Sequence, residues 1–251
     1  MSIPLSISKS GMNAVQTAMD ALSNDIANVN TTGYKSKNVS FNELLKNDIN
    51  GGNILLSDQI QNSAITIGTK SGVNTINMAQ GSLVSDENAY HLAIEGDGFF
   101  GVTDANNQFY LTRDGAFQLN GDKSITNSNG DRLSIESAIP PEQWPAGDLS
   151  IAANGEIRIQ TEDTNMLIGT IPLFTPAVSD ALVSVGGNKF TYNGDYIQTT
   201  GSIHQHYLES SNTDLATAMT DMMLAQRSYS LNTRVAQGTD DMMSMINQFK
   251  Q

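Results

Sequence analysis

The N-terminal part of the chain carries apolar residues at helical spacing. Steps of three, four and seven residues place them on one face of an α-helix, which predicts a helix from about Ser6 to Val29. The segment Asn30–Gly33 ends it, because Asn and Gly tolerate the left-handed backbone of helix C-termini. The apolar positions are Leu5, Met12, Val15, Met19, Leu22, Ile26 and Val29.

The opposite face of this helix is rich in Asn and Thr. It carries Asn13, Thr17, Asp20, Asn24 and Asn28. Asn and Asp are poor residues for a helix interior, because their side chains compete for backbone hydrogen bonds. A solvated helix face normally carries Lys and Glu, so this face suggests packing against protein.

The C-terminal part predicts a second helix, from about Thr213 to Phe249. Asn212 is the expected N-cap, and Asp214 suits the positive end of a helix. The apolar rhythm slips by one residue near 231–234, which predicts a bend or a change of partner face there. The two runs are Leu215, Met219, Met222, Gln226 and Tyr229, then Val235, Thr239, Met242, Ile246 and Phe249.

Two amphipathic ends predict that the ends pair. One interpretation is an intramolecular hairpin that buries both stripes, which is the commoner outcome. The other is that the stripes also pack between subunits. Most of the Met residues lie in these two segments, and Met suits adaptable surfaces, which slightly favours the second interpretation.

The middle of the chain predicts strands and turns. Asn154-Gly155 between alternating Ile residues is typical of a β-hairpin, and Asn193-Gly194 repeats the pattern. The expected fold class is α+β: paired N- and C-terminal α-helices forming a coiled-coil-like layer, with a central all-β domain. The expected domains are 1–45 (helix and following loop), 46–80 (extended connector), 81–204 (β domain) and 205–251 (last helix).

Composition excludes several function classes. The net charge is −13, the sequence pI is about 4.4 and only 16% of residues are charged. Nucleic acids and anionic membranes need basic surfaces, so neither is an expected partner. No apolar run approaches the ~20 residues of a membrane span. Cysteine is absent, which excludes disulfides and thiol chemistry, and the first residues do not resemble a cleavable signal.

No residue pattern predicts catalysis. His204 and His206 share a spacing of two, and Glu209 follows, but no further metal ligand is evident. The segment Asp104–Gln108 resembles a calcium loop without its Gly and its final Glu. We therefore expect no enzyme activity, cofactor, metal or small-molecule substrate.

Three motifs resemble the bacterial flagellar rod and hook family. The first is Ser23-Asn24, Ile26-Ala27-Asn28, a Thr at 31 or 32, then Gly33-Tyr34-Lys35. The second is the pair "AIEGDGFF" and "YLTRDGAF", and the third is the C-terminal helix from "SNTDLATAM" onward. They occur in the family's order and cover both ends and much of the middle. The stretch between about Gly121 and Leu149 departs from the family pattern.

Within the family the resemblance is greatest to the distal rod type. The alternatives are the proximal rod type or another hook, cap or junction member. A rival from a different class is a secreted β-rich enzyme or adhesin with helical tails. That rival predicts a monomer with ordered ends and a ligand pocket, and the missing signal peptide and missing catalytic pattern count against it. The compact middle argues against a hook protein.

The resemblance implies a structural role and a set of partners. Such subunits pass unfolded through the flagellar type III export apparatus, without signal cleavage, and polymerise helically in the basal body outside the cytoplasmic membrane. Their terminal helices surround the export channel, and the shaft transmits motor torque to the hook. Expected partners are further copies of this chain, other rod proteins, hook or junction proteins and the export apparatus.

The predicted assembly interface combines both helices and the loop between helix and connector. We hypothesise that Asn24, Asn28 and Asn30 bond to neighbouring subunits, because an amide costs less to desolvate than a charge. The other members are Met12, Met19, Leu22, Ile26, Gly33, Leu215, Met219, Met222, Tyr229, Met242 and Ile246.

A first prediction concerns the isolated monomer. Its terminal helices lack the neighbours that would cover their outer faces, so they should be disordered or only transiently helical. Trypsin should therefore trim the dilute monomer to a core near residues 70–205, identified by mass spectrometry. Uniform resistance along the whole chain would contradict this expectation.

Overall fold

A computed structural model describes most of the chain as two compact units. The helical unit comprises the described residues within 1–27, 37–75 and 214–251, and the β unit those within 28–36 and 76–213. The predicted connector lies partly outside the described residues. Those are 3–46, 65–72, 75–137, 139–140, 144–145, 147–160, 165–176, 182–192, 194, 196–199 and 201–249.

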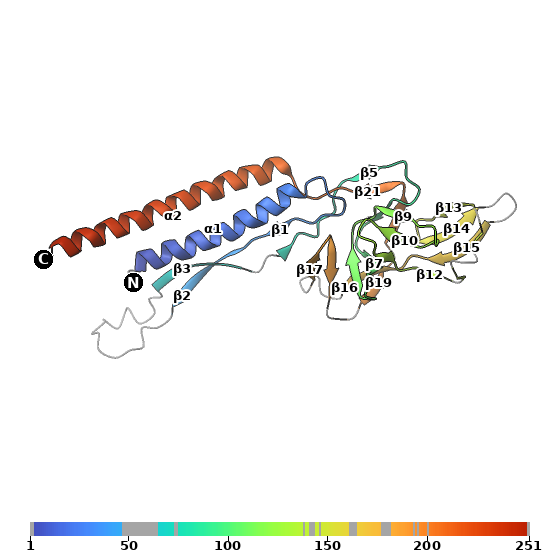
Figure 1. Cartoon of the computed structure of the whole chain (residues 1–251), viewed down its shortest axis with the longest axis horizontal. Coiled ribbons are helices and arrows are strands. Elements are labelled where there is room, and N and C mark those ends of the chain that lie inside the picture. Colours follow the sequence, from blue (N-terminus) through green and yellow to red (C-terminus); the bar gives the residue numbers. More distant parts are fainter. Residues whose placement is uncertain are drawn as a thin grey trace. The chain divides into compact units, whose positions relative to one another are not determined.

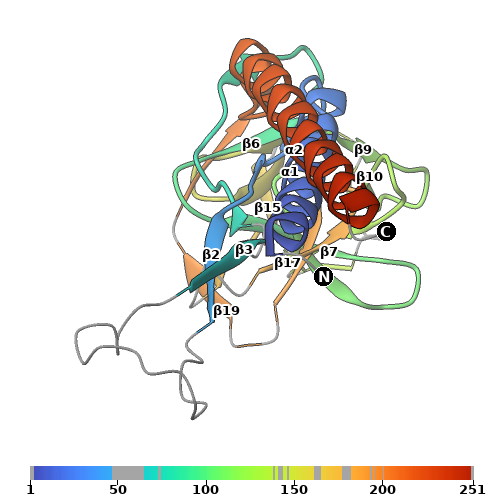
Figure 2. The same ribbon diagram turned by 90° about the vertical axis from the view of Figure 1, so that its left-hand side faces the viewer.

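The helical unit pairs the two ends of the chain. Helices α1 (Ile3–Ala27) and α2 (Leu215–Phe249) run antiparallel and pack along each other (Figure 1). An antiparallel ribbon of β2 (Phe41–Lys46) and β3 (Ile65–Ser71) lies on the other side of α1 (Figure 2). The short strand β1 (Lys37–Asn38) precedes this ribbon. The predicted α+β fold with paired terminal helices is therefore confirmed.

Most of the buried positions on the two helices carry small side chains. The buried positions of α1 are Ser8, Ala14, Ala18, Ala21 and Asp25, and those of α2 are Ala218 and Thr239. A Cβ atom added at Gly11 would lie 3.0 Å from the amide nitrogen of Asn232. The distance between packed helices depends on the side chains at the contact. Gly11, which has no side chain, therefore lets the two helix backbones approach closely beside Asn232.

The residues of α2 that face α1 differ from the apolar stripe that the sequence shows. The face of α2 toward α1 keeps a heptad spacing without a slip, and α2 continues unbroken through residues 231–234. The helix therefore has no break at the predicted bend. Of the residues that set the apolar rhythm, Met222 and Thr239 face inward and the others are exposed. The inward-facing positions are Ala218, Met222, Ala225, Asn232, Ala236 and Thr239.

The start of α2 also differs from the prediction. Asp214 is the N-cap: its Oδ1 accepts the backbone N–H of Ala216 at 3.0 Å, and its Oδ2 accepts the hydroxyl of Thr217 at 2.8 Å. These bonds lower the pKa of Asp214, the Thr217 hydroxyl contributing most. Asn212 is not the cap, because its side chain is used inside the β unit.

The β unit is built from antiparallel strand pairs. Its main sheet has the order β17-β18-β8-β7-β11-β10-β9, with β16 pairing both β7 and β19. A second sheet has the order β12-β15-β14-β13, and two further pairs are β20-β6 and β21-β5. Strand β4 (Thr75–Ile76) lies where the residue ranges of the two units meet.

The strands of the β unit are short. They are β5 (Leu83–Ser85), β6 (Leu92–Glu95), β7 (Phe99–Thr103), β8 (Phe109–Thr112), β9 (Phe117–Leu119), β10 (Ile125–Asn127), β11 (Arg132–Leu133), β12 (Glu136–Ser137), β13 (Asp148–Ile151), β14 (Glu156–Gln160), β15 (Asn165–Thr170), β16 (Leu173–Pro176), β17 (Val183–Gly186), β18 (Lys189–Thr191), β19 (Tyr196–Thr199), β20 (Ser202–Gln205) and β21 (Tyr207–Glu209).

One of the two predicted hairpins is present. Strands β13 and β14 pair antiparallel around Asn154-Gly155, Gly155 has a φ of 83°, and Ile157 and Ile159 are buried. Among the described strand pairs, β18 and β19 are not partners. Strand β18 pairs with β17 and β8, and β19 pairs with β16, so the hairpin expected at 193–194 is wrong.

Two apolar clusters form the core of the β unit. The larger contains fully buried Phe100, Phe117 and Ile157 together with Trp144, the single Trp of the chain. The smaller contains Phe99, Leu111, Leu182 and Phe190. Because Trp144 is buried in the larger cluster, its fluorescence reports the folding of this unit.

Candidate assembly interface

A buried carboxylate joins distant segments of the chain inside the β unit. Glu209, at the end of β21, is only 1% exposed. Its Oε1 lies 2.6 Å from the Nζ of Lys35 and accepts the backbone N–H of Gly81 at 2.9 Å. Its Oε2 lies 3.3 Å from Nη1 of Arg113. The carboxylate therefore ties the loop of residues 28–36 to the β8–β9 segment.

The two cations have further partners of their own. Lys35 donates to the carbonyl of Ala79 at 2.8 Å, and Arg113 donates to the carbonyl of Gly96 at 2.8 Å. The guanidinium carbon of Arg113 lies 5.2 Å from the centroid of the Phe99 ring. The Nε of Arg113 is buried without a hydrogen bond.

Burial dominates the electrostatics of this cluster. Desolvation lowers the pKa of Lys35 and the pKa of Arg113, while the carboxylate of Glu209 opposes the shift in both. A buried ion pair stabilises a fold weakly when complete, but loss of one partner leaves an uncompensated charge. The three side chains therefore have to be present together.

Glycine is required at position 33, where the loop of residues 28–36 meets the segment between β8 and β9. Gly33 has a φ of 64°, and its N–H donates to the backbone carbonyl of Glu209 at 2.8 Å. A Cβ atom there would lie 2.5 Å from the backbone of Arg113 and Asp114. Beside it, the hydroxyl of Thr32 donates to the carboxylate of Asp114 at 2.6 Å. Gly33, predicted as an interface residue, is thus buried within the β unit.

Asn212 fixes two other segments of the same unit. Its Oδ1 accepts the backbone N–H of Ser36 at 2.8 Å, and its Nδ2 donates to the carbonyls of Asn77 and Ala79 at 2.8 and 3.0 Å. The sequence had suggested a helix cap here. No local signal in the sequence identifies this cluster, because its members lie in polar segments that are far apart along the chain.

The residues considered for chemistry do not converge. His204 pairs with Glu95 at 2.6 Å, while Glu209 is occupied by Lys35 and Arg113. Over the described part of the chain, no group of three His, Asp or Glu side chains is arranged to hold a metal ion. Neither α1 nor α2 is long and apolar enough to cross a membrane.

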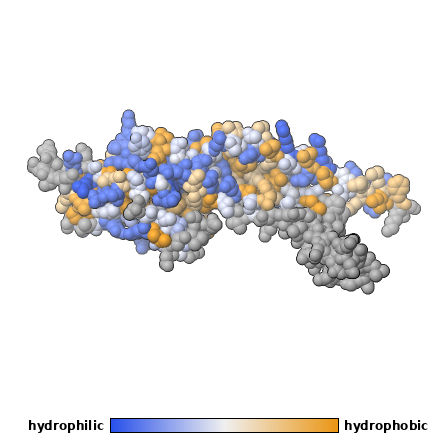
Figure 3. Space-filling view, turned by 180° about the vertical axis from the view of Figure 1, so that it is seen from behind, coloured by the Kyte–Doolittle hydropathy of each residue, from blue (hydrophilic) through white to orange (hydrophobic). Residues whose placement is uncertain are grey.

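The predicted interface residues of α2 are mostly exposed. Met222 is half-buried against α1, whereas Leu215, Met219, Tyr229, Met242 and Ile246 are exposed. Figure 3 shows hydrophobic residues over the surface of the helical unit. On α1 the predicted residues Met12, Met19, Leu22 and Ile26 are half-buried.

The three Asn residues of the hypothesis have different surroundings. Asn24 is exposed on α1, and its Nδ2 donates to the carbonyl of Asp20 at 2.8 Å, one turn earlier. Asn28 belongs to the β unit, where its Oδ1 accepts the hydroxyl of Thr31 at 3.2 Å. Asn30 is exposed in the same loop. Their bonds to a neighbouring subunit remain a prediction.

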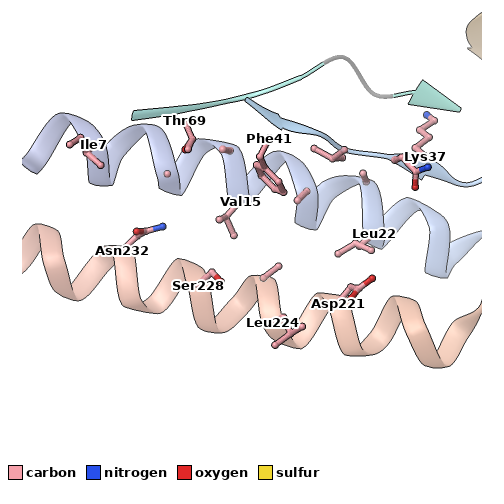
Figure 4. A pocket seen from close by; sticks show the side chains of 17 residues that line it. Ile7, Val15, Leu22, Lys37, Phe41, Thr69, Asp221, Leu224, Ser228 and Asn232 are labelled. Atoms are coloured by element: carbon pink, nitrogen blue, oxygen red, sulfur yellow. The ribbon is translucent and has the colours of Figure 1, made fainter. Parts of the chain in front are cut away.

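An apolar groove runs along α1 in the helical unit (Figure 4). It encloses about 670 Å³ between α1, α2 and the strands that follow Lys37. Gly11, Ala14, Ala18 and Ala21 are among its lining residues on α1, and their small side chains leave space beside the helix. The other lining residues are Ile7, Val15, Leu22, Lys37, Asn38, Val39, Phe41, Thr69, Asp221, Leu224, Ala225, Ser228 and Asn232.

A second prediction tests the buried charge cluster. The substitution Glu209→Gln should destabilise the β unit by about 3–5 kcal/mol, because it leaves Lys35 and Arg113 buried without a counter-charge. Adding Lys35→Met should restore part of this loss, since one unpaired cation is removed. Urea unfolding followed by Trp144 fluorescence measures both effects.

The matched control is Glu156→Gln, which removes a carboxylate from the exposed Glu156–Arg158 pair. Its unfolding midpoint should equal that of the unchanged chain. Equal midpoints for Glu209→Gln and Glu156→Gln would contradict the role given to the buried cluster.

Family models match three separate parts of the chain. Residues 5–35 match the model described as flagella basal body rod protein, and residues 204–249 match the flagellar basal body rod FlgEFG protein C-terminal model. Residues 93–159 match the flagellar hook protein FlgE/F/G D1 domain.

Similar proteins match over nearly their whole length. Flagellar basal-body rod protein FlgG of Buchnera aphidicola subsp. Acyrthosiphon pisum is 30% identical over 96% of this chain and 97% of its own. FlgG of Agrobacterium fabrum is 30% identical over 97% of both chains, and FlgG of Borreliella burgdorferi is 28% identical over 96% of both. This chain therefore belongs to the family of bacterial flagellar basal-body rod proteins.

Proposed function

We propose that this chain is a structural subunit of the flagellar rod, of the distal type, that polymerises into the shaft between motor and hook. The observation that carries this proposal is the pattern of side chains on α2. Small residues of α2 meet α1, while its large apolar residues are exposed. The exposed residues are Leu215, Met219, Met223, Leu224, Tyr229, Leu231, Val235, Met242, Met245, Ile246 and Phe249.

So much exposed apolar surface on one helix favours burial against other subunits. Apolar burial contributes roughly 25 cal/mol for each Å² removed from water, and large exposed apolar patches typically mark interaction sites. Contacts between unlike surfaces of identical chains generate open helical polymers when the rotation does not close a ring. A rod is a polymer of this kind.

The wider setting rests on the family resemblance. In this proposal the helical units surround the export channel, and subunits reach the growing tip through the flagellar type III apparatus. The rod then lies in the basal body outside the cytoplasmic membrane, in contact with other rod proteins and with hook or junction proteins. The role is structural and requires no enzyme activity.

Mass spectrometry of purified hook–basal bodies from the source bacterium tests this proposal. We expect the chain to copurify with other rod proteins, and its abundance relative to them should separate a distal from a proximal subunit. A chain that is absent from basal bodies but free in the medium would overturn the proposal.

A hook–basal-body protein of another type is the alternative. Flagellar hook-basal body complex protein FlhP of Bacillus subtilis is 26% identical over 94% of this chain. The same abundance measurement, together with the order in which the proteins are lost from mechanically sheared basal bodies, distinguishes the two assignments.

A further prediction concerns the amide side chains. The double substitution Asn24→Ala with Asn28→Ala should weaken assembled rods, because amide bonds to neighbouring subunits would be lost. Alanine favours helix more than Asn, so the α1 helix itself is not expected to be weakened by the change at position 24. Breakage of purified basal bodies under shear measures the effect.

The control is Asn106→Ala in an exposed turn of the β unit, which should leave rods unchanged. Rods of normal mechanical stability from the double variant would show that these amides do not contribute to assembly.

A further inference from the structure

The last turns of α2 extend beyond the start of α1. The helices are antiparallel, Gly11 lies against Asn232, and the hydroxyl of Thr233 lies 3.6 Å from the sulfur of Met12. This register places the first turn of α1, Ile3–Ser6, opposite residues 237–242. The described part of α1 therefore ends near Met242, and residues 243–249 lie beyond it; together, residues 242–249 form the projecting end of α2 at the left of Figure 1.

The projecting end presents four apolar anchors on one face. Met242, Met245, Ile246 and Phe249 follow the i, i+3, i+4, i+7 spacing with which a helix binds in a hydrophobic groove. They are exposed by 56, 51, 64 and 90%. Residues 242–249 contain no charged side chain.

The groove along α1 matches these anchors in chemistry and length. Most of its lining is apolar, and its two charged residues, Lys37 and Asp221, have opposite signs. Its lining residues on α1 extend from Ile7 to Leu22, about 22 Å along a helix, whereas the eight-residue anchor segment spans about 12 Å. Ile7, Phe41 and Leu224 stand exposed at the groove and offer apolar contact.

We propose that the projecting end of α2 docks in the α1 groove of a second copy of this chain. The inference rests on the proposed rod function and names the contact that extends the polymer. The occupant cannot be the same molecule, because one wall of the groove, from Asp221 to Asn232, belongs to the same continuous helix as the anchors. Each copy thus has one anchor and one groove, which is a head-to-tail contact.

Disulfide cross-linking tests this contact directly, because the chain has no native cysteine. The pair Thr69→Cys and Gln248→Cys places one thiol at the groove and one beside the anchors. Oxidised basal bodies from cells with this variant should give a ladder of dimers and higher multimers of this chain. The control pair, Asn13→Cys with Gln248→Cys, moves the first thiol to an exposed position outside the groove and should give no ladder.

The outcomes separate this contact from the rod function. If the unchanged chain is present in basal bodies but the Thr69–Gln248 pair gives no ladder, the docking is wrong and the rod function stands. If the unchanged chain is absent from basal bodies, the rod function itself fails, and this proposal fails with it. A cross-linked product that contains a different flagellar protein also overturns docking between copies.

A charge substitution decides the matter if the cysteine variants do not assemble. Ile246→Asp places a carboxylate among the anchors and should reduce the amount of this chain in basal bodies by about tenfold or more. Asn247→Asp adds the same charge on the opposite face and should leave that amount unchanged. Equal amounts for the two variants would overturn the docking.

Discussion

The carboxylate of Glu209 is the contact on which the organisation of the β unit depends. Its two oxygens meet Lys35, Arg113 and the N–H of Gly81, which lie far apart in the sequence. A buried charge is tolerated only with partners, so the three segments have to fold together. Asn212 then ties Ser36 to Asn77, so three of the four points where the chain leaves the β unit are held close together.

This arrangement separates buried from exposed residues within the family motifs. Gly33 is predicted as an interface residue, but it and Lys35 are buried within the β unit. Their contacts fix where the chain enters and leaves the helices. The large apolar residues of α2 have the opposite character, because they are exposed and make few contacts with α1. In the proposed rod, the buried residues serve the fold and the exposed residues of α2 serve assembly.

Local signals in the sequence predicted the fold well, and long-range contacts did not follow from them. The two helices and the hairpin at Asn154-Gly155 were predicted because periodicity and turn chemistry act over a few residues. The capping role of Asp214 was missed because the expected cap, Asn212, instead bonds to Asn77, more than a hundred residues away. The pairing of Glu209 was missed because its partner Lys35 is equally distant in the sequence. Apolar periodicity found the helices and the apolar stripe of α2, but it left open whether α1 or another subunit covers that stripe.

The same ambiguity bears on the proposed assembly surface. A stripe of Leu, Met, Ile and Phe predicts a buried seam, but it does not specify which molecule covers the seam. In this chain Gly11 lies against Asn232 and Met12 against Thr233, and most of the large apolar side chains of α2 stay exposed. A hairpin that buried its largest residues internally would be a stable monomer with nothing left to polymerise. Leaving them outside makes the helical unit incomplete by itself, which is the property that a self-assembling shaft requires.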